Sequence, residues 1–506
     1  MNCSPWNIFR KEDIMHSKIK QCFVGALTVA LCVSFVGCFG GGTNSKVEAP
    51  DELSHASGSE GIGDGYLTAQ QWLDTLETRN YEGYRFTVAT TLQYSFVPEE
   101  ESGLISTAVY ERNRMVEEKY NITIVEKIYD KEQLLTEQKK AALSGKAIGD
   151  VITAPGEQLA VLADNNLLIN LYSLPYFDPL SDYMQLDLVK ASTVAHTMYA
   201  MYGSVTDVSN HLWAVFYNKE MLEDLDLTDP YERVTQGDWT WDAFLDMANT
   251  AAGETVDDNS PDPESDIYGF ASYFSDEEDD DGLFHAVWQS SGEKYLGDTY
   301  WVDKLTIAVS PDITETLKAT LKAVTYRNGA RFNGTGAQAL EAFTDGRLLF
   351  YVYEMSIAAA MGESGISWGI VPMPKLTAQQ EDYHCWVDPQ TLVLGVAASV
   401  PDTERTGIIL NALCAASFGT VSQAIEETYL NYYLTNNSAA VMLFDYVFAK
   451  AQLDPVHIYG VGMQELGKET YDIVKSNLTS SSKLSSKLLS SSNLELIEAY
   501  LKEKFK

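Results

Sequence analysis

The chain has 506 residues, of which 72 are Asp or Glu and 35 are Lys or Arg, so its formal net charge is −37 at pH 7. Nucleic-acid binding depends on clustered Lys and Arg, and this balance therefore excludes a nucleic-acid or polyanionic partner. Apolar residues make up 45% of the chain. They can form a large core, and the length predicts two or three folding units.

An apolar run near the N-terminus resembles the signal peptide of a bacterial lipoprotein. Residues 22–36 are mostly apolar, two lysines precede them, and Gly37 stands directly before Cys38. On this resemblance, residues 1–37 are a removable leader and Cys38 is the lipidated first residue of the mature chain. The apolar run is shorter than the roughly 20 residues of a spanning helix. We therefore expect an exported protein that is held at the outer face of the cell membrane by its lipid alone.

Two further features flank this leader. Glu12 and Asp13 precede the basic segment, which fits a signal peptide poorly, so we expect translation to begin at Met15 rather than at Met1. Residues 38–65 are rich in Gly, Ser and acidic residues and have little to bury. They predict a flexible tether between the lipid and the folded protein.

Strands and helices alternate in the next part of the chain. Its apolar patterns predict strands over residues 84–91, 122–128 and 150–154, and helices over residues 105–120, 131–143 and 158–164. Strands separated by helices of this length imply right-handed crossovers. The pattern predicts an α/β fold with a parallel sheet that is covered on both faces.

The middle of the chain adds few motifs with specific chemistry. The acidic run Asp276–Asp281 lacks the ligand spacing of a calcium-binding loop, so we favour a solvated loop and leave calcium open. No His-Glu-x-x-His motif is present, and we expect no metal and no cofactor. Beyond Cys38 the cysteines are Cys385 and Cys414, and the sequence leaves open whether they pair.

Six segments in a fixed order carry a family resemblance: Val109–Ile124, Trp213–Leu222, Gly237–Phe244, Ile267–Phe270, Ala342–Phe350 and Trp368–Lys375. Together they resemble the extracellular solute-binding proteins of ABC importers, in the carbohydrate-binding group called family 1. The resemblance implies a two-lobe periplasmic-binding-protein-like fold with a hinge and a ligand cleft between the lobes. The first lobe would hold residues 66–205 and 391–430, the second residues 206–390 and 431–506, with the hinge near residues 202–210 and 392–399.

Candidate ligand contacts follow from this fold. Ligands of α/β sheets lie outside the C-terminal ends of the strands. By resemblance, residues 284–292 reach the cleft and Tyr353 and Glu354 stand where the family often has a ligand contact, while Tyr383 and Trp386 lie in a loop just before the expected return crossing. Aromatic rings stack on sugar faces, and polar side chains bind the hydroxyl groups. For each aromatic residue alone, packing in the core is the alternative. The candidates are Thr91, Gln93, Pro155, Glu157, Phe284, Trp288, Tyr353, Glu354, Tyr383 and Trp386.

The resemblance predicts a non-catalytic, monomeric receptor that captures a sugar or oligosaccharide and delivers it to an ABC permease. A surface glycoside hydrolase is the alternative from another class, and it needs two carboxylates about 5–10 Å apart across a sugar. Residues 365–369 match G-x-S-x-G, but the prolines that follow argue against the helix that this nucleophile motif requires. The same fold with a peptide or another solute as ligand is the third possibility.

Overall fold

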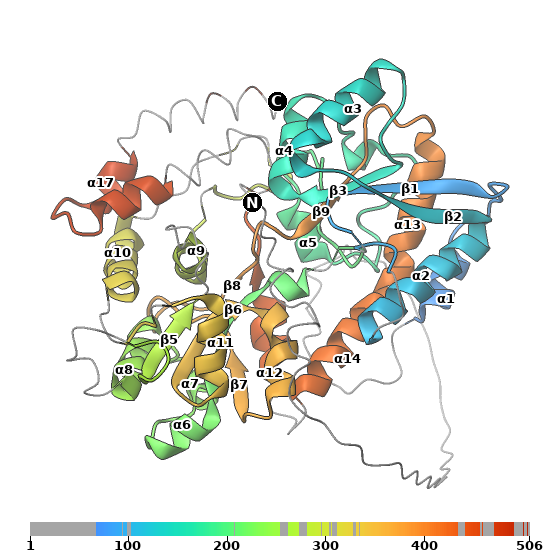
Figure 1. Cartoon of the computed structure of the whole chain (residues 1–506). Coiled ribbons are helices and arrows are strands. Elements are labelled where there is room, and N and C mark those ends of the chain that lie inside the picture. Colours follow the sequence, from blue (N-terminus) through green and yellow to red (C-terminus); the bar gives the residue numbers. More distant parts are fainter. Residues whose placement is uncertain are drawn as a thin grey trace, which may run out of the picture. The chain divides into compact units, whose positions relative to one another are not determined.

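A computed structural model of the chain shows two four-stranded sheets with helices packed against them (Figure 1). The predicted leader, the predicted tether and all of the acidic run except Asp281 lie outside the described residues. The described residues are 67–93, 95–98, 103–206, 208–252, 262–272, 281–294, 296–302, 305, 311–326, 330–332, 334–433, 441–455, 458, 470–489, 499 and 503.

The first sheet has the strand order β2-β1-β3-β9. Its strands are β1 (Tyr84–Thr90), β2 (Ile122–Ile128), β3 (Val151–Pro155) and β9 (Leu392–Gly395). Strands β1, β2 and β3 are parallel, as the sequence predicts, and β9 joins β3 in the antiparallel direction. The α/β fold class is therefore confirmed.

Helices before, between and after these strands complete the first half of the fold. They are α1 (Ala69–Thr75), α2 (Leu104–Tyr120), α3 (Leu134–Leu143), α4 (Gly156–Asp164), α5 (Leu186–Ala191), α13 (Thr403–Phe418) and α14 (Val421–Tyr433). Helices α2 and α13 lie side by side (Figure 1). Asn121 ends α2 in the left-handed conformation, with φ of 49°, which an asparagine tolerates.

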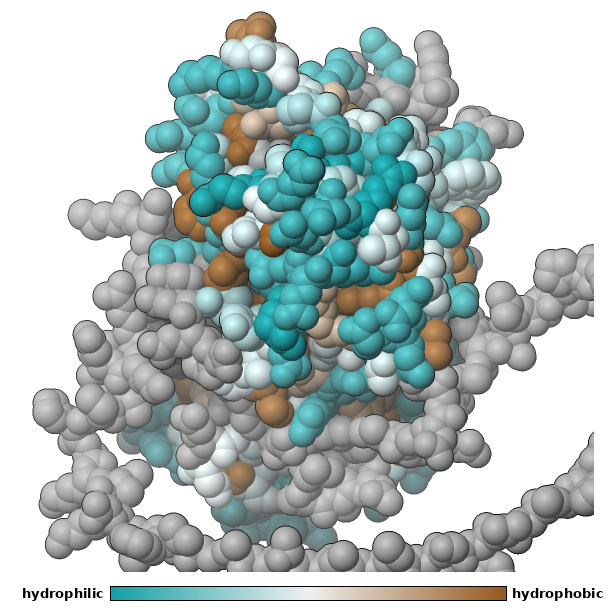
Figure 2. All heavy atoms as spheres, turned by 90° about the vertical axis from the view of Figure 1, so that its right-hand side faces the viewer, coloured by the Kyte–Doolittle hydropathy of each residue, from teal (hydrophilic) through white to brown (hydrophobic). Residues whose placement is uncertain are grey.

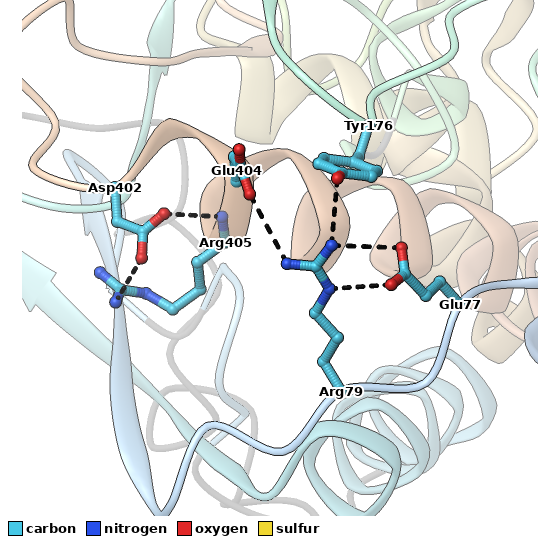
Figure 3. Close-up of polar contacts among 6 residues, drawn as sticks. All are labelled: Glu77, Arg79, Tyr176, Asp402, Glu404 and Arg405. Atoms are coloured by element: carbon cyan, nitrogen blue, oxygen red, sulfur yellow. Dashed lines mark hydrogen bonds and ion pairs between the residues drawn. The ribbon is translucent and has the colours of Figure 1, made fainter.

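Ion pairs and a cap fix the first turn of α13 (Figure 3). The Asp402 carboxylate accepts a hydrogen bond from the Arg405 backbone N–H and pairs with the Arg405 guanidinium, both at 3.0 Å. Arg79, which precedes β1, pairs with Glu404 at 3.6 Å and with Glu77 at 3.1 Å. These contacts attach the helix to the segment that leads into the sheet.

The second sheet has the strand order β5-β6-β4-β7. Its strands are β4 (Trp213–Asn218), β5 (Tyr268–Ser272), β6 (Leu348–Glu354) and β7 (Trp368–Val371). β5 is parallel to β6, and β4 is antiparallel to both β6 and β7. Because β7 and not a helix follows Ser367, the G-x-S-x-G match is not a nucleophile elbow.

Helices and one small ladder surround this second sheet. The helices are α6 (Lys219–Asp224), α7 (Pro230–Gln236), α8 (Trp241–Ala252), α9 (Asp281–Ser290), α10 (Pro311–Tyr326), α11 (Gly336–Thr344), α12 (Ala358–Ser364), a π-helix (Met442–Val447) and α17 (Leu484–Leu489). β8 (Cys385–Trp386) pairs in parallel with β10 (Ala451–Gln452). Helix α8 packs against β5, and α11 packs against β6.

Two chain segments connect the sheets and run antiparallel beside each other. Met201 and Leu394 exchange backbone hydrogen bonds of 2.9 and 3.0 Å. Farther along, the Asp388 N–H donates to the His211 carbonyl at 2.9 Å. These crossing segments, residues 201–212 and 387–394, coincide in part with the predicted hinge.

The described chain also contains one apolar stretch, Thr403–Tyr429, that is long enough to cross a membrane. However, 72% of its most apolar window is buried inside the protein, which is typical of a core helix.

Cys414 in this stretch and Cys385 in β8 are both buried and free. The two cysteines therefore do not form the pair that the sequence left open, and burial raises the pKa of each thiol to about 12.

Candidate functional site

The C-terminal strand ends of both sheets lie next to the second crossing segment. In the first sheet, Pro155 at the end of β3 is paired with Leu392. In the second sheet, Glu354 at the end of β6 is paired with Trp213, which begins the antiparallel strand β4. Leu212, directly before Trp213, forms a bridge to Val387. The chain thus brings side chains from four distant segments to these strand ends.

Aromatic rings gather at the end of the second sheet. Ring centroids lie 5.3 Å apart for Trp213 and Trp386, 5.6 Å for Trp213 and Tyr353, and 5.6 Å for Trp386 and His285. We call these four residues the aromatic cluster. Three of the four belong to different strands, and His285 comes from α9.

Phe284 and Trp288, also from α9, stack on each other at 6.1 Å. Phe284 also contacts the Tyr471 ring edge-on at 4.7 Å. Trp288 is only 2% exposed, so in this conformation it is a core side chain. Tyr383 donates to the Val234 carbonyl at 3.2 Å, and its ring neighbours are Tyr446 and Lys375 rather than the aromatic cluster.

Acidic groups and a histidine border the aromatic cluster. His211 Nδ1 lies 3.2 Å from Glu354 Oε1, and the Ser356 hydroxyl lies 3.3 Å from the other oxygen of this carboxylate. Burial raises the pKa of Asp388 to about 7, and the nearby charge of Glu354 adds to this effect. His211 and the Trp213 indole act in the opposite direction. The carboxyl group of Asp388 therefore keeps its proton to a higher pH than an ordinary aspartate does.

The first sheet contributes smaller polar groups. Thr91 donates its backbone N–H to the Thr153 carbonyl at 3.3 Å, while the buried hydroxyls of both threonines have no hydrogen-bond partner among the described residues. Glu157 is exposed and accepts from the Gln158 amide at 3.1 Å. Gln93 is exposed, and Pro155 is buried. The predicted residues of this lobe are thus at the strand ends, although they differ in accessibility.

Further buried polar atoms near the aromatic cluster also lack partners among the described residues. They include the Trp386 indole N–H, the amide nitrogen of Gln452 and both amide atoms of Gln289. A buried polar group without a partner costs about 1–3 kcal/mol, and in native proteins water or a ligand usually satisfies it. These atoms provide hydrogen-bonding capacity for a ligand with several hydroxyl groups.

Sequence reasoning missed several residues of this site. Trp213, His211 and Asp388 lie in or beside the crossing segments, and Gln289 lies one helical turn after His285 in α9. Trp213 and the residues before it could have been predicted from strand direction. A strand that runs antiparallel to its neighbour begins beside the residues where that neighbour ends.

The described residues contain no group of three or more potential metal ligands. A pocket of about 380 Å³ beside α8 contains none of the predicted residues.

Comparisons with known proteins agree with this architecture. A family model described as bacterial extracellular solute-binding protein matches residues 114–405. No curated protein matches the chain at a significant level.

Three solved structures of similar fold each share 14% identity with the chain. The cyclic alpha-maltosyl-1,6-maltose binding protein from Arthrobacter globiformis gives a TM-score of 0.56 over 83% of this chain and 100% of its own. UgpB from Mycobacterium tuberculosis, in complex with glycerophosphocholine, gives 0.52 over 84% and 99%. The substrate-binding protein Lmo0181 from Listeria monocytogenes, in complex with cycloalternan, gives 0.50 over 83% and 98%. At this identity the likeness shows the two-sheet binding-protein fold alone.

Proposed function

Because this chain belongs to the family of bacterial extracellular solute-binding proteins, which bind solutes and are not enzymes, we propose that it serves an ABC importer as its sugar receptor. Its ligand is a sugar or a small oligosaccharide. The family implies a location outside the cytoplasm. One face of the described chain is largely hydrophilic (Figure 2), in keeping with the net charge of −37.

The aromatic cluster is the observation that supports a sugar. Trp213, Tyr353 and Trp386 pack together beside the Glu354 carboxylate and are 3%, 9% and 3% exposed. Their rings, and the Trp386 indole N–H that has no partner among the described residues, would therefore face a ligand only after the lobes open. Sugars present apolar C–H faces and many hydroxyls, and this combination of groups suits both. One of the similar structures is a cyclic alpha-maltosyl-1,6-maltose binding protein, and another is in complex with cycloalternan. The third is in complex with glycerophosphocholine, so the fold alone leaves the ligand open.

We expect the ligand to be held between two lobes. The first would comprise residues 66–205 and 391–430, and the second residues 206–390 and 431–506. A ligand that contacts both lobes favours the closed conformation, and the crossing segments would absorb the motion. The closed receptor would then dock on the permease.

A thermal-shift screen of the mature chain from residue 39 tests this function. A ligand that binds the folded state alone raises the melting temperature by an amount that grows with its concentration. We expect a shift with at least one mono- or oligosaccharide, which is recovered uncut. Cleavage products would support the glycoside hydrolase instead, and a shift with peptides alone would contradict the sugar assignment.

Replacement of Trp386 by phenylalanine separates ligand binding from folding. The Trp386 indole N–H has no partner among the described residues, so its removal breaks no hydrogen bond with them. We expect the smaller phenylalanine ring to lower the free energy of unfolding by about 1–2 kcal/mol. We expect affinity for the sugar found in the screen to fall about tenfold, as measured by calorimetry, because a hydrogen bond and ring area are lost. Trp239→Phe is the control, since the Trp239 indole already donates to the Pro372 carbonyl at 2.9 Å. Equal affinities of Trp386→Phe and wild type would remove Trp386 from the site.

We further propose that Cys38 carries a lipid anchor after removal of residues 1–37. Cys38→Ser is expected to abolish incorporation of a labelled fatty acid and to move the protein out of the membrane fraction. Cys32→Ser is the matched control, because Cys32 lies within the apolar leader and should leave both readouts unchanged. Retention of label in Cys38→Ser would contradict the anchor.

A further inference from the structure

A buried arginine lies behind the loop that follows β1. Arg112 of α2 is 1% exposed, and it forms no ion pair with any described residue. Burial lowers the pKa of its guanidinium to about 9. The charge of Glu126 acts in the opposite direction, and a buried charge is costly unless opposite charges and hydrogen bonds compensate for its loss of water. The groups that receive its hydrogen bonds therefore indicate its role.

One hydrogen bond of Arg112 reaches this loop, at Phe96, and another reaches the Ser417 hydroxyl of α13 at 3.5 Å. Arg112 Nη2 donates to the Phe96 carbonyl at 3.3 Å, and the guanidinium carbon lies 4.3 Å from the centre of the Phe96 ring. The neighbouring Asn113 amide donates to the same carbonyl at 2.8 Å. Arg112 also donates to the Asn113 side-chain oxygen at 2.8 and 3.0 Å, which fixes the orientation of the amide.

Glu126 of β2 holds the same loop from the other side. One oxygen of its carboxylate accepts hydrogen bonds from the backbone N–H of Phe96 and, at 2.9 Å, from that of Val97. The Ser95 hydroxyl lies 3.4 Å from this oxygen and 3.0 Å from the Thr90 hydroxyl at the end of β1. The N–H, the carbonyl and the ring of Phe96 are therefore all restrained.

We propose that Arg112, Asn113 and Glu126 are positioning residues for ligand binding, which hold Phe96 and so fix the loop that carries Thr91 and Gln93. This inference rests on the proposed function. Arg112 and Asn113 are 1% and 6% exposed and so are too deeply buried to serve as first ligand contacts, whereas Glu126 is partly exposed and its carboxylate is engaged by the backbone of the loop. A loop that is ordered before binding loses less conformational freedom when the ligand arrives.

The test compares two glutamates that make the same kind of contact. Glu126→Ala removes the loop restraint, whereas Glu117→Ala removes a carboxylate of α2 that accepts from the Ile124 backbone N–H at 2.6 Å, away from the loop. Hydrogen exchange of the unliganded proteins is measured at the amides of residues 92–97. We expect exchange to be at least about tenfold faster in Glu126→Ala and unchanged in Glu117→Ala. Equal exchange in the two variants would overturn the proposal.

Binding of maltotriose and cycloalternan is then measured well below the melting temperature of each variant. We expect affinity to fall about tenfold in Glu126→Ala and little in Glu117→Ala, because ordering the loop becomes part of the cost of binding. Faster exchange with unchanged affinity would overturn the role in ligand binding. If the wild type binds neither sugar, the sugar assignment fails for these two probes. The exchange experiment then still decides whether Glu126 restrains the loop. Asn113→Ala serves as a second variant if Glu126→Ala does not fold.

Discussion

Replacement of Trp288 by alanine is expected to lower the free energy of unfolding by about 3–5 kcal/mol, because it leaves a large cavity in a packed core. The Trp288 side chain is 2% exposed and stacks on Phe284. Urea unfolding, followed by circular dichroism, measures this loss. Weaker sugar binding by this variant reports a lost contact only if binding is measured on protein that is still folded.

The matched control is Trp301→Ala. Trp301 is 50% exposed, although its ring contacts the Tyr172 ring at 4.8 Å. We expect a loss of about 1 kcal/mol or less, because exposed side chains lose little burial on truncation. Equal losses for the two tryptophans would contradict the core position of Trp288, which the sequence proposed as a ligand contact.

The stability of the protein is expected to fall as the pH rises toward 7, and Asp388 is expected to account for about 2–4 kcal/mol of this fall. Burial raises the pKa of Asp388 to about 7 in the folded protein, whereas an unfolded aspartate titrates near about 3.9. Between these values the unfolded chain releases a proton that the folded protein keeps. Rising pH therefore favours the unfolded chain until the folded group has also ionised.

Asp388→Asn tests this contribution, because asparagine resembles the protonated carboxyl group. We expect wild type and variant to differ little in urea unfolding at pH 4 and the variant to be more stable at pH 8. Glu157→Gln is the control, since Glu157 is exposed and should shift stability by less than about 0.5 kcal/mol at either pH. A variant that is destabilised equally at both pH values would show that Asp388 is ionised throughout.

Asp388 also links stability to the proposed function. Its backbone N–H donates to the His211 carbonyl, and this hydrogen bond joins the two crossing segments. Its charge lies next to Glu354, so a ligand that contacts Glu354 would change the surroundings of both acids. We therefore expect sugar affinity to depend on pH in wild type more strongly than in Asp388→Asn.

The sequence by itself determined the elements whose signals are local. The alternation of apolar strands and amphipathic helices predicted β1, β2 and β3 and their parallel pairing, since a crossover helix leaves few other arrangements. The segment around Thr240 also followed local rules. Its hydroxyl accepts from the Ala243 N–H at 3.3 Å and caps α8, as expected of a threonine before a helix.

The tertiary structure alone decided the composition of the candidate site. Strand β9 enters the first sheet from residues more than 200 positions later, and it pairs antiparallel with β3. His211 and Asp388 lie close to Glu354 because the two crossing segments pass the end of β6. No local sequence pattern predicts this proximity. Periodicity reports which side of an element is buried, but not what buries it. For this reason Trp288 and Trp386 look alike in the sequence, and only packing distinguishes them: Trp288 stacks on Phe284, whereas Trp386 lies against Trp213 beside the crossing segments.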